Sequence, residues 1–280
     1  MVRGGEVERI ELSAELALPK IVESGQCFRP VRLENGLYRL ISGQNILYCR
    51  QRSPHELEIS CGKEEWEAVW VPYFDLKRDY RALCETAEEN AFLSAALEHG
   101  RGLRILRQDH WEMLISFLLS QRKSIPAIRT SIQKLCQRYG AVRRTAYEEA
   151  VFLFPTPEAL RKAEPEELCS CGLGYRVSYV KDAAEKVLCG ALPLQDLEAL
   201  DDEALFDQLC RVRGVGKKVA NCVMLFAYGR YERVPSDVWI QRIVEKKYAG
   251  REPFSAWRGA GILQQHLFYY ALKHKEEFTK

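Results

Sequence analysis

Lys218 and Asp237 are the residues of this 280-residue chain whose types and spacing best suit chemistry. Lys218 lies in the run RVRGVGKKVANC at positions 211–222, and Asp237 follows nineteen residues later. A neutral lysine amine attacks electrophilic carbon and can form a Schiff base. A carboxylate that folds back beside it can stabilise positive charge developing on a sugar. The pair therefore predicts covalent chemistry at an electrophilic carbon.

A helix-hairpin-helix is predicted around Gly214 and Gly216, at about residues 202–228. Apolar residues recur at helical spacing in residues 202–210 and again from 219 to 226. The two glycines interrupt this pattern, and glycine permits backbone angles and close approach that other residues resist. Free N–H groups and the positive end of the second helix favour an anion there. The commonest ligand of such a motif is a DNA phosphate, and Lys217 is placed to contact it.

Each of these residues also has a purely structural interpretation. Lys217 and Lys218 fit as solvated lysines in a first helical turn, although cations there are slightly unfavourable. Asp237 precedes a predicted helix and fits as its N-cap. Cys222 shares a helix face with Lys218, four residues away, but a free cysteine is usually a small core residue.

Composition describes a soluble globular protein, with 47% hydrophobic and 29% charged residues. No apolar run approaches the ~20 residues of a membrane span, and residues 1–11 contain no apolar signal core. The ten cysteines are dispersed, which favours reduced thiols in the cytosol. Their spacing suits neither a zinc nor an iron–sulfur site. We therefore expect a cytoplasmic protein without a metal centre or membrane contact.

Positive charge is concentrated in two segments, although the net charge is only +2. Residues 101–144 carry ten basic residues against two acidic ones, and residues 211–247 carry nine against three. A local basic face on a near-neutral protein suits a protein that follows a DNA backbone. A solvated surface is the alternative explanation of the same charges.

The predicted fold class is α+β, with an antiparallel β domain at residues 1–85 and a larger α-helical domain at residues 86–280. Short apolar runs between turn signals predict strands at 37–40, 45–50 and 56–60. From residue 79 onward the periodicity is helical. The helices beside the hairpin are predicted at residues 111–119, 125–139, 157–163, 175–188, 238–248 and 256–275.

Gln264 and Phe268 lie four residues apart on the last predicted helix. Taken alone, Phe268 would be a core residue and Gln264 a surface or capping residue. Together they can stack on a flipped base and hydrogen-bond its Watson–Crick edge, as base-flipping enzymes require.

These residues, taken in order, carry a resemblance over most of the chain. The sequence resembles the 8-oxoguanine DNA glycosylase/lyase family of the helix-hairpin-helix DNA glycosylase superfamily. The matching motifs are Ser24-Gly25-Gln26-Cys27-Phe28-Arg29, Arg107-Gln108-Asp109, Gly172-Leu173-Gly174-Tyr175-Arg176, the hairpin with Lys218, Val234-Pro235-Ser236-Asp237, and Gln264 with Phe268.

The resemblance implies a role for each matching position. Lys218 would be the nucleophile and Schiff-base former, with Asp237 as its electrostatic and proton-handling partner. The Gly25 carbonyl would accept the N7–H that 8-oxoguanine has and guanine lacks. Cys222 and Phe268 would sandwich the base, and Gln264 would read its pairing edge. Tyr175 would wedge into the gap in the base stack, and Arg176 would contact the orphaned cytosine.

The sequence departs from the animal and yeast members of the family after residue 119. Those members have an Asn-rich run and then an arginine that reads the opposite cytosine, whereas this chain has SQRKSIPA at 120–127. Arg122 or Lys123 would fill the void in the DNA instead, and Ala127 has no donor to offer. Trp239 also stands where those members have a histidine. These differences predict looser opposite-base selectivity and a bacterial-type branch.

The leading hypothesis is a bifunctional DNA glycosylase with apurinic-site lyase activity on duplex DNA that contains 8-oxoguanine. The alternatives are an alkylated-base DNA glycosylase, which commonly lacks the lysine, and a noncatalytic DNA-binding module. We expect a monomer in the bacterial cytoplasm, associated with the nucleoid. No cofactor is expected, with a monovalent cation at the hairpin as the one alternative.

Overall fold

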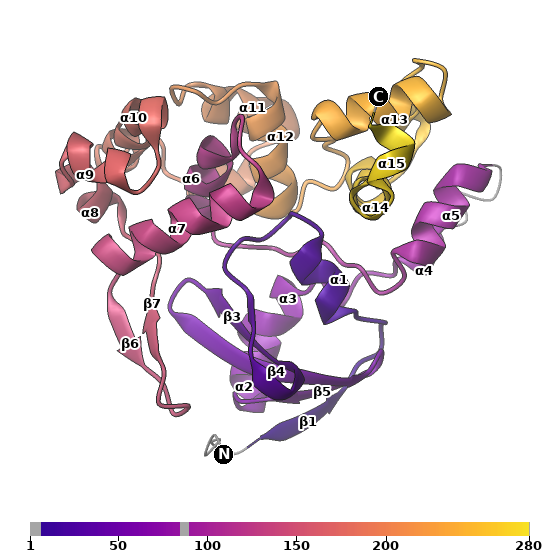
Figure 1. Ribbon diagram of the computed structural model, residues 1–280, viewed down its shortest axis with the longest axis horizontal. Coiled ribbons are helices and arrows are strands. Elements are labelled where there is room, and N and C mark those ends of the chain that lie inside the picture. Colours follow the sequence, from indigo (N-terminus) through magenta and orange to yellow (C-terminus); the bar gives the residue numbers. More distant parts are fainter. Residues whose placement is uncertain (1–6, 85–89, 280) are drawn as a thin grey trace.

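An antiparallel sheet forms the amino-terminal part of the computed structural model, which describes residues 7–84 and 90–279 (Figure 1). Its strand order is β1-β5-β4-β3-β2. Leu40 and Leu47 are opposite each other in the β3–β4 pair and are fully buried. The three strands predicted here are confirmed. The strands are β1 (Glu8–Glu11), β2 (Val31–Arg32), β3 (Leu37–Ser42), β4 (Asn45–Ser53) and β5 (Glu56–Ile59).

Short helices also occur in this part, where mainly strands were predicted. They are α1 (Leu18–Glu23), α2 (Lys63–Glu65) and α3 (Val71–Tyr73), with a π-helical turn at Trp66–Trp70 between the last two. Trp66, Trp70 and Phe74 follow one another at intervals of four residues and are all buried in the core beneath the sheet. Intervals of four place side chains on one helix face, which explains why this segment is helical within a part of the chain where mainly strands were predicted.

The larger part of the molecule is helical, as predicted. The predicted boundary at residues 85 and 86 falls outside the described residues. The helices are α4 (Arg81–Cys84), α5 (Ala91–His99), α6 (His110–Ser120), α7 (Ile125–Tyr139), α8 (Pro157–Lys162), α9 (Pro165–Ser170), α10 (Val177–Leu188), α11 (Asp202–Cys210), α12 (Lys217–Phe226), α13 (Val238–Lys247), α14 (Ala260–Lys273) and α15 (Lys275–Phe278).

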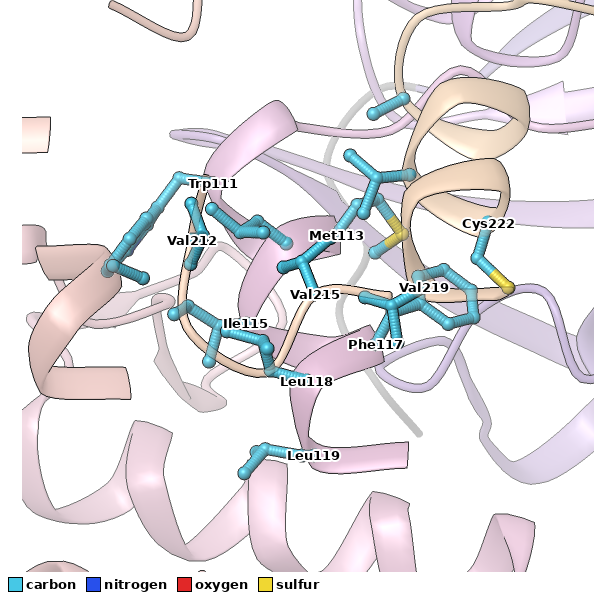
Figure 2. Packing of buried hydrophobic residues seen from close by; sticks show 14 of the residues in the cluster. Trp111, Met113, Ile115, Phe117, Leu118, Leu119, Val212, Val215, Val219 and Cys222 are labelled. Atoms are coloured by element: carbon cyan, nitrogen blue, oxygen red, sulfur yellow. The ribbon is translucent and has the colours of Figure 1, made fainter. Parts of the chain in front are cut away.

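Helix α6 occupies the middle of the largest core. Its residues from His110 to Leu119 are all buried, which is the pattern of a helix surrounded by other elements. Figure 2 shows Val212, Val215 and Val219 packed against side chains of α6. The hairpin and the first turn of α12 are therefore fixed on a buried support.

The predicted helix-hairpin-helix is confirmed as α11, the turn at residues 211–216, and α12. Asp201 caps α11 by accepting a hydrogen bond from the Ala204 N–H at 2.8 Å. Helix α12 begins without a side-chain cap, at Gly216. Its first N–H groups are therefore available to an external anion.

A β-hairpin that the sequence did not predict joins the two parts of the molecule. It consists of β6 (Val142–Arg144) and β7 (Ala150–Phe152), and it extends from the helical part towards the sheet (Figure 1). Tyr147 stacks on Tyr48 of β4 with ring centroids 3.9 Å apart. Glu149 pairs with Arg39 of β3 and accepts a 2.8 Å hydrogen bond from the Tyr48 hydroxyl.

Candidate active site

Lys218 is half-buried at the second position of α12, whereas Lys217 beside it is exposed. The Lys218 Nζ donates to the Ser120 hydroxyl over 3.3 Å and lies 5.3 Å from the centre of the Phe117 ring. Both partners belong to α6. The hairpin therefore presents one lysine to solvent and holds the other against a buried helix.

Asp237 is the N-cap of α13, as its structural interpretation predicted. Its Oδ1 accepts hydrogen bonds from the N–H groups of Trp239 and Ile240, both at 3.0 Å. Burial raises the pKa of the Asp237 carboxyl, while those two N–H groups and the positive charge of Lys218 act in the opposite direction. A carboxylate that feels the Lys218 charge while capping a helix is positioned for both roles.

Cys222 lies in the same electrostatic environment. It is buried, 3% exposed, and burial raises the pKa of its thiol, against the effect of Lys218. Asp237 raises the Cys222 pKa further, so both catalytic candidates are close enough to act on this thiol. The structure thus brings together all three residues that the sequence placed around the amine.

Gly25 and Phe268 form a second group. Gly25 has φ +78°, and a Cβ at this position would lie 3.1 Å from Phe268 Cε1 and 3.0 Å from Ile125 Cδ1. Within residues 7–84 and 90–279, the Gly25 carbonyl accepts no hydrogen bond. A free carbonyl therefore stands beside an aromatic ring that is half-buried.

Gln264 lies one helical turn before Phe268 on α14. It is 3% exposed, and its Oε1 has no hydrogen-bond partner among the described residues. A buried amide oxygen without a partner carries a desolvation penalty. This residue is therefore prepared for a polar ligand, rather than being the surface or capping residue that it would be if taken alone.

Phe117, which sequence reasoning missed, connects these two groups. Its ring lies under the Lys218 amine and makes an edge contact with Phe28, with centroids 5.7 Å apart. Phe28 belongs to the same motif as Gly25. The position of Phe117 on α6, soon after the Arg107-Gln108-Asp109 motif, was the only signal in the sequence.

Tyr175 is 53% exposed, as a wedge must be, and the Arg176 guanidinium carbon lies 4.3 Å from its ring centre. Arg176 itself is only 6% exposed. Its guanidinium donates to the carbonyls of Gln121 and Leu173. Two backbone carbonyls therefore hold most of the Arg176 side chain inside the protein, and its contact to the orphaned cytosine stays a prediction.

Arg122 and Lys123 also form a pair in which one side chain is exposed and the other is held by hydrogen bonds to the protein. Arg122 is exposed and has φ +52°. The Lys123 Nζ donates to the Ser131 hydroxyl and the Gly172 carbonyl, both at 2.6 Å. Burial and the charge of Arg176 lower the Lys123 pKa. Of the two residues, only Arg122 has a side chain that extends freely from the surface.

The two hairpin glycines serve different purposes. Gly214 has φ +84°, and a Cβ there would come within 2.3 Å of Tyr179 Cδ2. Gly216 is the N-cap of α12, and a Cβ there would meet no atom within 4 Å. Gly214 therefore makes the turn possible, whereas Gly216 leaves open space over the free N–H groups of α12.

Across residues 7–84 and 90–279, no three or more His, Cys, Asp or Glu side chains are grouped so as to hold a metal ion. No helix in those ranges has the length and hydropathy to cross a bilayer. The absence of a cofactor stays a prediction.

Two family models match consecutive parts of the chain that forms this fold and site. Residues 9–114 match the amino-terminal domain of 8-oxoguanine DNA glycosylase. Residues 115–253 match the helix-hairpin-helix superfamily of base excision DNA repair proteins. The fold and the lysine site thus define a base excision repair protein of the helix-hairpin-helix class.

Individual proteins extend this similarity to nearly the whole chain. A probable N-glycosylase/DNA lyase of Methanothermobacter thermautotrophicus is 31% identical, over 88% of this chain and 83% of its own. The structure of MBOgg1 with a low-affinity DNA ligand has a TM-score of 0.91 at 34% identity, covering 98% of both chains. The Clostridium acetobutylicum 8-oxoguanine glycosylase/lyase, bound to duplex DNA with cytosine opposite 8-oxoguanine, has a TM-score of 0.87 at 29% identity, covering 98% of this chain and 100% of its own. The chain belongs to the 8-oxoguanine DNA glycosylase/lyase family.

Proposed function

We propose that this protein removes 8-oxoguanine from duplex DNA and then cleaves the strand at the resulting abasic site. The observation that carries the proposal is the Lys218 amine, half-buried on α12, whose positive charge acts on both the buried Asp237 carboxyl and the buried Cys222 thiol. An alkylated-base glycosylase or a noncatalytic DNA-binding module would have no use for such an amine.

In the proposed reaction, the Nζ lone pair of Lys218 forms a bond to the sugar C1′ while the bond from C1′ to the base breaks. The departing base takes the electron pair of that bond and a proton. The Asp237 carboxylate stabilises the positive charge on the sugar. The amine then loses a proton and its lone pair forms the C1′=N bond, while the ring oxygen leaves C1′ with the C1′–O4′ electron pair and takes up a proton from water. The product is a protonated Schiff base. Loss of a C2′ proton expels the 3′ phosphate with the C3′–O electron pair.

Recognition of the lesion depends on the second group of residues. The unbonded Gly25 carbonyl suits the N7–H of 8-oxoguanine and repels the N7 lone pair of guanine. The partnerless Gln264 Oε1 would accept a hydrogen bond from the pairing edge of the base. Phe268 and Cys222 would enclose its two faces.

The DNA backbone would be held at the hairpin. Other residues would fill the gap that the flipped base leaves in the base stack. Gly216 leaves the amino terminus of α12 open to a phosphate, and Lys217 is exposed beside it. Tyr175 would enter the stack as a wedge, and Arg122, which is exposed, would occupy the void. A monovalent cation at the hairpin, a monomeric state and a nucleoid-associated bacterial location also stay predictions.

Borohydride trapping tests this function, because hydride reduces the Schiff base to a stable amine and leaves the protein covalently attached to DNA. The unmodified protein should be trapped on a duplex with 8-oxoguanine opposite cytosine. Lys218→Gln should abolish both excision and trapping while retaining lesion binding. Lys217→Gln is the matched control and should still be trapped. A Lys218→Gln protein that traps DNA would refute the assignment.

A further inference from the structure

Gln265 ties the segment that contains Gly25 to the helix that carries Gln264 and Phe268. The Gln265 Nε2 donates a 2.7 Å hydrogen bond to the carbonyl of Ser24. Both residues are buried, Gln265 being 3% exposed and Ser24 fully buried. Adjacent residues on a helix point about 100° apart. Gln265 therefore reaches the Ser24 carbonyl, while the neighbouring Gln264 has a side-chain oxygen without a hydrogen-bond partner among the described residues.

This hydrogen bond fixes the backbone immediately before the lesion-reading carbonyl. The Ser24 carbonyl and the Gly25 N–H share one planar peptide unit. Holding that oxygen therefore holds one side of Gly25, a residue whose lack of a side chain leaves it conformationally free. Other hydrogen bonds hold the Ser24 N–H and hydroxyl, which bond to the Ile21 carbonyl, and the hydroxyl also accepts from Gln26 Nε2. The bond from Gln265 is the one that holds the Ser24 carbonyl itself.

The other side of Gly25 is held by Gln26, which is fully buried. The Gln26 Nε2 donates to the Arg104 carbonyl at 2.9 Å, and its Oε1 accepts from the Leu106 N–H at 2.8 Å. The Gln26 carbonyl also accepts a 2.9 Å hydrogen bond from Gln108. The bond from Gln265 instead joins the Ser24 backbone to α14, the helix that bears Gln264 and Phe268. Lys273, at the end of α14, also pairs with the Glu23 side chain, but that contact does not hold the Ser24–Gly25 peptide.

From these contacts we infer that Gln265 is a positioning residue for lesion recognition, which holds the Gly25 carbonyl at the correct place relative to Gln264 and Phe268. The inference rests on the proposed function. Gln265 does not touch the base, and its effect passes through the Ser24–Gly25 peptide. It therefore matters for reading a base and has no part in the attack of Lys218 on a sugar that has already lost its base.

Gln265→Met tests this assignment, because it keeps the length of the side chain and removes the donor. Two single-turnover rates are compared: excision of 8-oxoguanine opposite cytosine, and Schiff-base trapping on a preformed abasic site in the same duplex. We expect excision to fall about tenfold, the effect of one buried hydrogen bond, and abasic-site trapping to remain within about twofold of the unmodified protein.

Gln51→Met is the matched control, because Gln51 of β4 also uses its side-chain amide to bridge backbone groups. It accepts from the Leu18 N–H and donates to the carbonyls of Leu16 and Ser53. This variant should leave the ratio of the two rates unchanged. If Gln265→Met fails to fold, Gln265→Asn, whose amide is one methylene shorter, should give the same selective loss. Equal loss of both rates, or no loss of either, would overturn the inference. Absence of both reactions in the unmodified protein would instead refute the proposed function.

Discussion

Gly25 and Phe268 lie so near each other that a side chain at residue 25 would crowd the Phe268 ring. A Cβ at Gly25 would lie 3.1 Å from Phe268 Cε1, and the φ of +78° disfavours any residue with a Cβ. The Gly25 backbone and the Phe268 ring are therefore close neighbours, and a Cβ at residue 25 would fit only if one of them shifted.

Gly25→Ala should selectively impair excision. The left-handed backbone costs an alanine about 1–2 kcal/mol, or about 5- to 30-fold, and relief of the contact would displace the carbonyl or the Phe268 ring. Single-turnover excision of 8-oxoguanine measures the loss. Gly43→Ala is the control, because Gly43 has φ +57° but no atom within 4 Å of its Cβ position. Equal losses of excision in both variants would show that strain, and not the position of the carbonyl, is responsible.

Asp237→Asn should fold and lose most of its excision rate. Asparagine remains a competent N-cap, so the hydrogen bonds to α13 have a replacement acceptor, while the charge that faces Lys218 is removed. We expect a fall of about 10²- to 10⁴-fold, measured by single-turnover excision with circular dichroism as the check on folding. A rate near that of the unmodified protein would leave Asp237 as a cap only.

The difference in stability between Asp237→Asn and the unmodified protein should depend on pH in a defined direction. Burial raises the Asp237 pKa, so the folded protein holds this proton more tightly than the unfolded chain does. The contribution of Asp237 to stability is therefore full below its unfolded pKa of about 3.9 and is lost as pH rises through the raised folded value. The Tm of the Asn variant relative to the unmodified protein should consequently increase over that range. A constant difference in Tm would contradict the raised pKa.

Gly214→Ala and Gly216→Ala should fail in different ways. The first adds a Cβ 2.3 Å from the Tyr179 ring at φ +84° and should lower the Tm. The second meets no protein atom, so its Tm should be unchanged while its affinity for duplex DNA falls, because the methyl group obstructs a phosphate at α12. Thermal unfolding and equilibrium binding separate the two effects. Unchanged binding by Gly216→Ala would argue against a phosphate at this turn.

Opposite-base selectivity should be looser than in the animal enzymes. Ala127 is exposed and offers no side-chain donor, and Arg176 is bonded to Gln121 and Leu173. A missing bidentate contact lowers discrimination by about 1–3 kcal/mol. We therefore expect measurable 8-oxoguanine excision opposite thymine, guanine and adenine, and a sharper cytosine preference in Ala127→Arg. Strict cytosine dependence of the unmodified protein would show that another residue, such as Arg122, supplies the contact.

Features with strong local signals could be predicted from the sequence. The hairpin at Gly214 and Gly216 was recognisable because two helical patterns meet at glycines, and α7 was predicted with its observed bounds of Ile125 and Tyr139. Lys218 and Asp237 followed from their place in that motif. Such features depend on neighbours within a few residues along the chain.

Features that depend on distant contacts could not be predicted. The strand Val142–Arg144 is exposed throughout and so has no alternation of apolar and polar residues to reveal it. Its stability comes from pairing with β7. The inward position of Arg176 likewise depends on the Gln121 carbonyl, 55 residues away, and the role of Gln265 depends on Ser24, 241 residues away.

That last separation has a consequence for the order in which the molecule is assembled. Lys218, Asp237 and the hairpin lie within residues 202–240, so the contacts among them close short loops. The bond between Ser24 and Gln265 closes one of the longest loops in the chain, and closure of long loops is entropically more costly and slower. We therefore expect the hairpin to form before the bond between Ser24 and Gln265. In that order of assembly, the proposed selectivity for the damaged base would be acquired late in folding, after the hairpin that carries Lys218.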